Sequence, residues 1–181
     1  GPGVVVDLSK DLGDYYVYEP ELLMKRADIR KGDILIINTG YHRYAWYEGK
    51  SDEVRYFCKH PGPGPKFHKW ALAMKFKWIG VDCGSADHPM NTIIRNWHPK
   101  LFTEAENKLA GNFGKKWDEL FPIDEYYQVM HLKLFPRRLV HAENLGGEIE
   151  KLSNKRCWLG FFPLKGMELE SAMGRAVAWL P

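Results

Sequence analysis

Three residues in the last third of the chain combine the side-chain types that bind divalent metals. His131 falls late in a predicted amphipathic helix, and His141 and Glu143 stand two apart on the predicted strand that follows. Residues i and i+2 of a strand point to the same face. Imidazole and carboxylate on one face suit zinc or manganese, or a general base oriented by its neighbour. Three polar groups that face solvent are the open alternative.

A second group of polar residues follows an apolar strand in the middle of the chain. Asp82 and Ser85 stand where that strand meets a turn, and Asp87, His88 and Asn91 come directly after. In open α/β sheets, ligands gather at the carboxyl ends of strands. These residues are therefore candidates to line or support a pocket, with Asp87 and His88 in contact with substrate. The alternative is a strand-end cap, in which Asp82 and Ser85 accept hydrogen bonds from turn amides.

Alternating strands and helices are predicted to position these groups. Short apolar runs predict strands at 4–8, 33–38, 78–82, 139–143, 157–163 and 174–180. Helical patterns predict helices at 19–31, 66–75 and 124–135. The stretch 41–64 reads as loop-rich, and 86–124 reads as the least regular part, with a short helix at 104–109. The order strand, helix, strand predicts an α/β domain with a partly parallel sheet, and a single domain over 1–181.

Aromatic residues are clustered after the second predicted strand. Tyr41, Tyr44, Trp46 and Tyr47 fall within seven residues, and aromatics make up 14% of the chain. They are candidate substrate-pocket or interface residues, although core packing would use the same side chains.

Charge and cysteine usage exclude several classes of protein. The 26 basic and 23 acidic residues are mixed along the chain and give a net charge of +3, so neither nucleic-acid nor membrane-surface binding is indicated. The cysteines Cys58, Cys83 and Cys157 form no CxxC pair, which favours a reducing compartment, most simply the cytoplasm. GxSxG, HExxH, Walker A and GxGxxG motifs are all absent from the sequence.

Six short segments, in order along the chain, carry a resemblance to a known family. They are VVVDLS at 4–9, KGDILIINTG at 31–40, HPG at 60–62 within 56–71, GVDCGSAD at 80–87, His131 followed by ENL at 143–145, and FPLK at 162–165 with GRAVA at 174–178. Together they resemble the kynurenine formamidase-like cyclase family, which includes isatin hydrolase. The similarity is interrupted by an apparent insertion at 89–123.

The resemblance implies a fold, a reaction and roles for several residues. The fold would be a swivelling β/β/α domain with a mixed sheet and flanking helices. The reaction would be hydrolysis of an amide, lactam or formamide bond by a water that one or two divalent metals, Zn or Mn, activate. His131 and Glu143 would be metal ligands or acid–base groups, Asp82 and Ser85 would line or support the pocket, and His141, at a usually aliphatic position, would be a replacement ligand.

One departure from the family matters for function. The family's principal metal ligands come from an HxGTHxD motif before the VVVDLS-like strand, and this sequence contains no such motif. We expect a second polypeptide to supply it, so that this chain is one subunit of a hydrolase acting on a small amide or cyclic substrate. A non-catalytic binding or regulatory subunit is the alternative, and a truncated chain is a third explanation. An exposed first strand would favour an oligomer.

Overall fold

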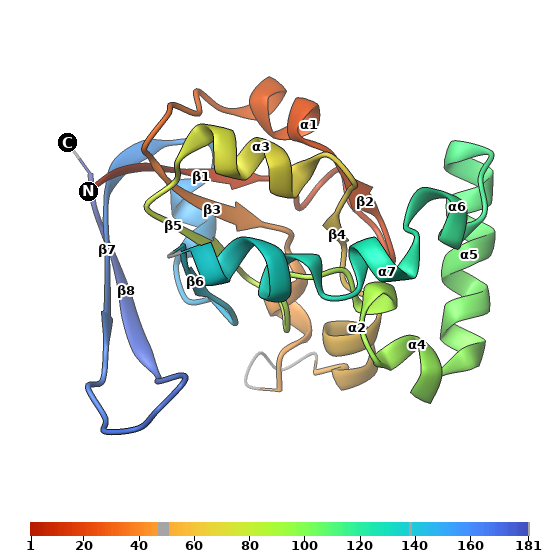
Figure 1. Cartoon of the computed structure of the whole chain (residues 1–181). Helices are drawn as coiled ribbons and strands as arrows, with labels where there is room; N and C mark the ends of the chain where they lie inside the picture. Colours follow the sequence, from red (N-terminus) through yellow and green to blue (C-terminus); the bar gives the residue numbers. More distant parts are fainter. Residues whose placement is uncertain (47–50, 138, 181) are drawn as a thin grey trace.

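The structure, a computed structural model, describes residues 1–46, 51–137 and 139–180 (Figure 1). Its centre is a six-stranded mixed sheet in the order β6-β5-β3-β1-β7-β8. The strands are β1 (Pro2–Asp7), β3 (Ile34–Asn38), β5 (Trp78–Val81), β6 (Val140–Ala142), β7 (Arg156–Pro163) and β8 (Gly174–Trp179). The first four run parallel, whereas β7 pairs antiparallel with both β1 and β8.

The parallel strands β1, β3 and β5 are apolar because both of their faces are covered. Val4 and Val6 face a core cluster that includes Leu23 and Phe67, and Val5 faces a second cluster on the other side. Helices α1 (Pro20–Arg26) and α3 (Phe67–Met74) lie together over the first face (Figure 1). On the second face, Leu145 and the 3-10 turn η5 (Ile149–Leu152) pack against side chains of β1, β3, β5 and β7. Strands buried on both faces explain the unbroken hydrophobic runs in the sequence.

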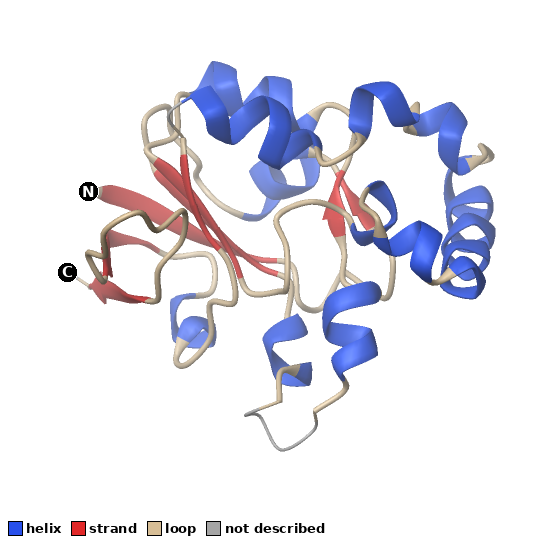
Figure 2. Cartoon of the chain, turned by 60° about the horizontal axis from the view of Figure 1, so that its bottom comes forward, coloured by secondary structure: helices blue, strands red, loops and turns tan. Residues whose placement is uncertain are grey.

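The prediction for residues 86–124 was wrong, because this region is the most helical part of the chain. It contains the 3-10 turn η2 (Pro89–Asn91) and the helices α4 (Ile94–Trp97), α5 (Pro99–Phe113) and α6 (Trp117–Leu120). Pro99 occupies the first turn of α5, and Gly114 with φ 64° ends it. Both are helix-boundary signals. These helices lie to one side of the sheet (Figure 2). They bury a third cluster around Trp117.

Short elements interrupt the loop-rich stretch 41–64. They are the 3-10 turn η1 (Tyr41–Tyr44), helix α2 (Glu53–Cys58) and β4 (Gly62–Pro63), which pairs with β2 (Val17–Tyr18). The helix expected at 124–135 is split into α7 (Ile123–Tyr126) and the π-helix η3 (Met130–Leu134), followed by the 3-10 turn η4 (Phe135–Arg137). Gln128, at φ 44°, interrupts the helical path between α7 and η3.

The first strand is not exposed. β1 lies between β3 and β7 and pairs with both. β1 is therefore not an exposed edge strand, and it gives no reason to expect an oligomer.

A glycine contact fixes how β4 approaches the loop after β5. A Cβ at Gly62 would lie 2.4 Å from Cα of His88 and 2.8 Å from its backbone nitrogen. Because backbone atoms cannot yield as a flexible side chain can, we expect Gly62→Ala to lower the free energy of unfolding by about 1–3 kcal/mol in urea titrations. Gly111→Ala is the matched control. Its Cβ would meet nothing within 4 Å inside α5, so that variant should gain about 0.5–1 kcal/mol. Equal changes in the free energy of unfolding of the two variants would contradict the close contact between Gly62 and His88.

Candidate functional site

The carboxyl ends of the four parallel strands lie at one edge of the sheet and carry the polar residues singled out in the sequence. Asp7 and Asn38 end β1 and β3, Asp82 follows β5, and Glu143 follows β6. Ion pairs and hydrogen bonds at this edge bring together side chains more than forty residues apart in sequence. This edge is the candidate functional site.

His131, His141 and Glu143 meet at this edge as the sequence predicts. One ligand atom from each lies within 4.8 Å of the other two. Glu143 Oε1 is 3.4 Å from His131 Nε2 and 3.9 Å from His141 Nε2. All three side chains are partly buried, with 34%, 31% and 21% of the His131, His141 and Glu143 side chains exposed. The structure therefore does not show the alternative, in which the three side chains would face solvent separately.

Asp87 holds His131 in place. Its carboxylate accepts hydrogen bonds from the His131 ring at Nδ1 (2.7 Å) and from the backbone N–H groups of Met130 (2.9 Å) and His131 (3.2 Å). The hydrogen bond with Asp87 raises the pKa of His131. Because Nδ1 is occupied, Nε2 is the nitrogen left to face Glu143 and His141. A carboxylate behind the ring is the usual way in which a metal-binding histidine is oriented.

His141 and Glu143 have environments that suit complementary roles. The ring of Phe135 stacks on His141 with centroids 3.8 Å apart and planes 3° from parallel. Burial and the neighbouring His131 lower the pKa of His141 to about 4, so its ring is neutral at pH 7. Burial raises the pKa of Glu143, whose Oε1 accepts a 2.7 Å hydrogen bond from the Ala86 N–H. A neutral imidazole can donate its lone pair to a metal.

The donor set fits a zinc or manganese ion. Ligand atoms at 2.0–2.1 Å from a tetrahedral zinc are roughly 3.3 Å from one another. The distances from Glu143 Oε1 to His131 Nε2 and His141 Nε2, 3.4 and 3.9 Å, are close to that value. Two imidazoles and one carboxylate are also a common ligand set for catalytic zinc. Small side-chain movements would therefore complete a three-ligand arrangement from the chain's own residues.

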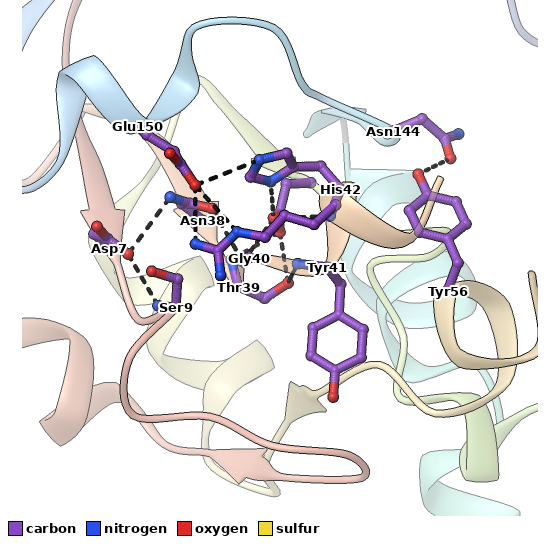
Figure 3. Close-up of polar contacts among 12 residues, drawn as sticks. Asp7, Ser9, Asn38, Thr39, Gly40, Tyr41, His42, Tyr56, Asn144 and Glu150 are labelled. Atoms are coloured by element: carbon purple, nitrogen blue, oxygen red, sulfur yellow. Dashed lines mark hydrogen bonds and ion pairs between the residues drawn. The ribbon is translucent and has the colours of Figure 1, made fainter. Parts of the chain in front are cut away.

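Asp82 organises a different part of the same edge. Its buried carboxylate accepts hydrogen bonds from the Thr39 N–H and hydroxyl (2.7 and 2.6 Å), from the Gly40 N–H (2.8 Å) and from His42 Nδ1 (2.9 Å). His42 Nε2 faces Glu150, 3.7 Å from its carboxylate (Figure 3). Asp82 is thus a strand-end cap with every acceptor position used, which is the alternative raised from the sequence. Ser85 likewise accepts a hydrogen bond from the Asp87 N–H.

The expected pocket residues are divided between two environments. Tyr44 and Trp46 line a hollow of about 180 Å³. Its other lining residues are Ala45, Glu53, Tyr56, Phe57 and Asn144. Asn144 follows Glu143 directly and accepts a hydrogen bond from Tyr56 (Figure 3), which places this hollow beside the histidine cluster.

The remaining predicted pocket residues do not line that hollow. Tyr41 is 3% exposed and donates its hydroxyl proton to Asp14, and Asp87 and His88 are each 1% exposed. Asn91 is also buried and bonds the Trp117 indole. Tyr47 lies outside the described residues. Burial excludes direct substrate contact for Tyr41, Asp87 and His88, because the space they face is filled by the chain itself.

Sequence reasoning missed two histidines. His42 pairs with Asp82, although only its place two residues after a strand-end Thr-Gly step hinted at this. His60 is fully buried, with Nδ1 bonded to the Pro61 carbonyl and Nε2 without a hydrogen-bond partner among the described residues. Its HPG step marked a turn, but nothing in the sequence indicated burial.

The fold and the motifs point to one class of protein. Residues 1–88 match the model of the family described as "Putative cyclase". This match contains the segments at 4–9, 31–40, 60–62 and 80–87, and it confirms the resemblance to the cyclase family. The swivelling β/β/α fold class, with a mixed sheet and flanking helices, is also confirmed. No curated protein sequence matches the chain.

Solved structures with this fold include hydrolases. An isatin hydrolase bound to the product analogue thioisatinate has a TM-score of 0.63 and 19% identity, covering 100% of this chain and 60% of its own. Isatin hydrolase A from Ralstonia solanacearum has a TM-score of 0.61 and 16% identity, covering 98% and 59%. A potential metal-dependent hydrolase with cyclase activity has a TM-score of 0.56 and 13% identity, covering 98% and 64%. The chain thus spans about 60% of their length.

Proposed function

We propose that this chain is a subunit of a metal-dependent hydrolase that cleaves a C–N bond in an amide, lactam or formamide. The observation that carries the proposal is the cluster of His131, His141 and Glu143 at the carboxyl edge of a cyclase-type sheet. The names of the structural neighbours, two isatin hydrolases and a potential metal-dependent hydrolase, support the same reaction class.

The three residues would hold a Zn or Mn ion, which when bound lowers the pKa of a water and polarises a substrate carbonyl. Asp87 would act as a positioning residue by fixing the His131 ring through Nδ1. With one carboxylate oxygen of Glu143 on the metal, the other would remain to take a proton from the attacking water and to return it to the leaving nitrogen. Tyr44 and Trp46 would contact the substrate in the hollow beside Asn144.

The proposal includes a partner. The sequence holds no HxGTHxD motif, so a second polypeptide would supply further ligands and complete the site in an oligomer. A cytoplasmic location belongs to the same proposal, and the three cysteines, all free, favour it. None of the described helices is long and apolar enough to cross a membrane. A non-catalytic binding subunit is the second candidate, favoured by the missing motif.

Replacing Glu143 by Gln is expected to weaken binding of Zn²⁺ or Mn²⁺ at least tenfold, because a neutral amide is a poorer ligand than a carboxylate. Isothermal titration of the protein with each metal measures this directly. Glu170→Gln, at an exposed position in the β7–β8 connection, is the control and should bind metal as the wild type does. Unchanged affinity in Glu143→Gln would remove Glu143 from the metal site.

Catalysis is tested by hydrolysis of amides, formamides and lactams, isatin among them, with the natively purified protein and added metal. Turnover that disappears in both Glu143→Gln and His131→Gln supports the hydrolase. Metal and substrate-analogue binding without turnover supports the binding subunit instead.

A further inference from the structure

A second hollow is lined by residues outside the histidine cluster. It has a volume of about 420 Å³ and is lined by residues of α3, of the π-helix η3, which contacts α3, and of the turn η4. Its lining residues are His68, Lys69, Leu72, Leu132, Lys133, Pro136 and Arg137. None of these residues belongs to the metal cluster or to the aromatic hollow.

Positive charge dominates this hollow. Lys69, Lys133 and Arg137 line it, and within the described ranges none of the three forms an ion pair with a carboxylate. Lys133 Nζ donates instead to the backbone carbonyl of Glu125, at 2.5 Å. Three cations at one site repel one another unless an anion joins them.

The pKa of His68 is affected by the same positive charges. Burial and the charges of Lys69 and Lys133 lower the pKa of its ring, while a hydrogen bond with the Pro65 backbone and the charge of Glu125 act in the opposite direction. Its Nδ1 is buried and has no hydrogen-bond partner among the described residues. The ring is therefore neutral at pH 7, and a nearby negative charge would raise its pKa.

The segment from 130 to 137 is shared between this hollow and the candidate metal site. His131 and Phe135, four residues apart, contact His141. Leu132, Lys133, Pro136 and Arg137 line the hollow instead. Residues 130–137 thus contribute side chains both to the hollow and to the surroundings of His141, and no residue of the segment belongs to both groups.

We propose that this basic hollow binds a phosphate group, either free or carried by a small organic molecule. A guanidinium offers paired N–H donors that match phosphate oxygens, and lysines add compact positive charge. Leu72, Leu132 and Pro136 provide apolar surface on which an organic group attached to the phosphate would pack. The proposal does not depend on the hydrolase activity, since it uses no residue of the metal cluster.

The test is an NMR titration of the metal-free protein at constant ionic strength, with inorganic phosphate in one arm and phenyl phosphate in the other. Saturable binding in either arm, with a rise in the pKa of the His68 ring, is the expected result. Tighter binding of phenyl phosphate identifies an organic phosphate as the ligand class, and equal binding identifies the free ion. Chloride at the same ionic strength should leave His68 unchanged.

A double variant provides the second readout. Lys133→Gln with Arg137→Gln should weaken phosphate binding at least tenfold, equivalent to about 1.4 kcal/mol. Lys100→Gln with Lys165→Gln, at two exposed positions elsewhere, is the matched control and should bind as the wild type does. Absence of saturation below about 10 mM phosphate, an unchanged His68 pKa, or equal losses in the two double variants would overturn the proposal.

Discussion

Asp82→Asn is expected to lower the free energy of unfolding by about 3–5 kcal/mol, the cost of breaking a buried charged network by removing one partner. The Asp82 carboxylate has no exposed surface and accepts hydrogen bonds from three backbone N–H groups, the Thr39 hydroxyl and the His42 ring. An amide in its place would direct an NH₂ group at donors, leaving buried N–H groups without acceptors.

The measurement is urea unfolding of Asp82→Asn and of Asp118→Asn. Asp118 is 61% exposed and pairs with Arg95 on the surface, so its loss should cost no more than about 1 kcal/mol. A cost below about 1 kcal/mol for Asp82→Asn would show that Asp82 does not organise this edge of the sheet.

Acidification from pH 7 to pH 5 is expected to remove about 4 kcal/mol of stability through two buried histidines. Burial lowers the pKa of His60 to about 4 and that of His88 to about 3. An unfolded histidine has a pKa of about 6.5. Below that value the unfolded chain takes up protons that the folded chain does not, so stability falls as the pH falls. At pH 5 each ring costs about 2 kcal/mol.

His60→Asn isolates one of these contributions. An asparagine amide can donate to the Pro61 carbonyl as His60 Nδ1 does, but it does not titrate. The loss of unfolding free energy between pH 7 and pH 5 should therefore shrink by about 2 kcal/mol relative to the wild type. His98→Asn, at an exposed position, is the control and should keep the wild-type dependence. If His60→Asn lost as much unfolding free energy between pH 7 and pH 5 as the wild type does, His60 would not be a buried neutral ring.

The sequence predicted β1, β3 and β5 well because each is short and buried on both faces. The apolar runs at 4–8, 33–38 and 78–82 became β1, β3 and β5 with ends shifted by one or two residues. The i, i+2 spacing predicted only that His141 and Glu143 share a face, whereas the structure shows His141 in β6, Glu143 directly after it, and both near His131.

Other features depend on contacts that local patterns do not encode. Asp87 looked like a pocket residue, but two backbone N–H groups and the His131 ring occupy its carboxylate. The helical path is interrupted at Gln128 and continues as a π-helix, in which the N–H groups of Met130 and His131 point toward Asp87. No residue spacing in the sequence predicts this. Tyr41 was placed in a pocket with its aromatic neighbours, although its hydroxyl partner, Asp14, is distant in sequence.

Two carboxylates after β5 serve similar purposes at this edge. Asp82 binds His42 and Asp87 binds His131, each through the Nδ1 atom of the ring. In both cases the carboxylate also accepts backbone N–H groups from the segment that carries the histidine. Each aspartate thus fixes a turn and a ring together, which leaves both Nε2 atoms oriented at the same edge of the sheet.

The central claim is that this edge holds a catalytic metal, and intact mass spectrometry with metal analysis of the natively purified, untagged protein tests it most directly. The proposed function predicts about one or two equivalents of Zn or Mn, a second polypeptide of its own mass, and loss of metal in Glu143→Gln. A single chain without bound metal, identical in the wild type and in Glu143→Gln, would contradict it.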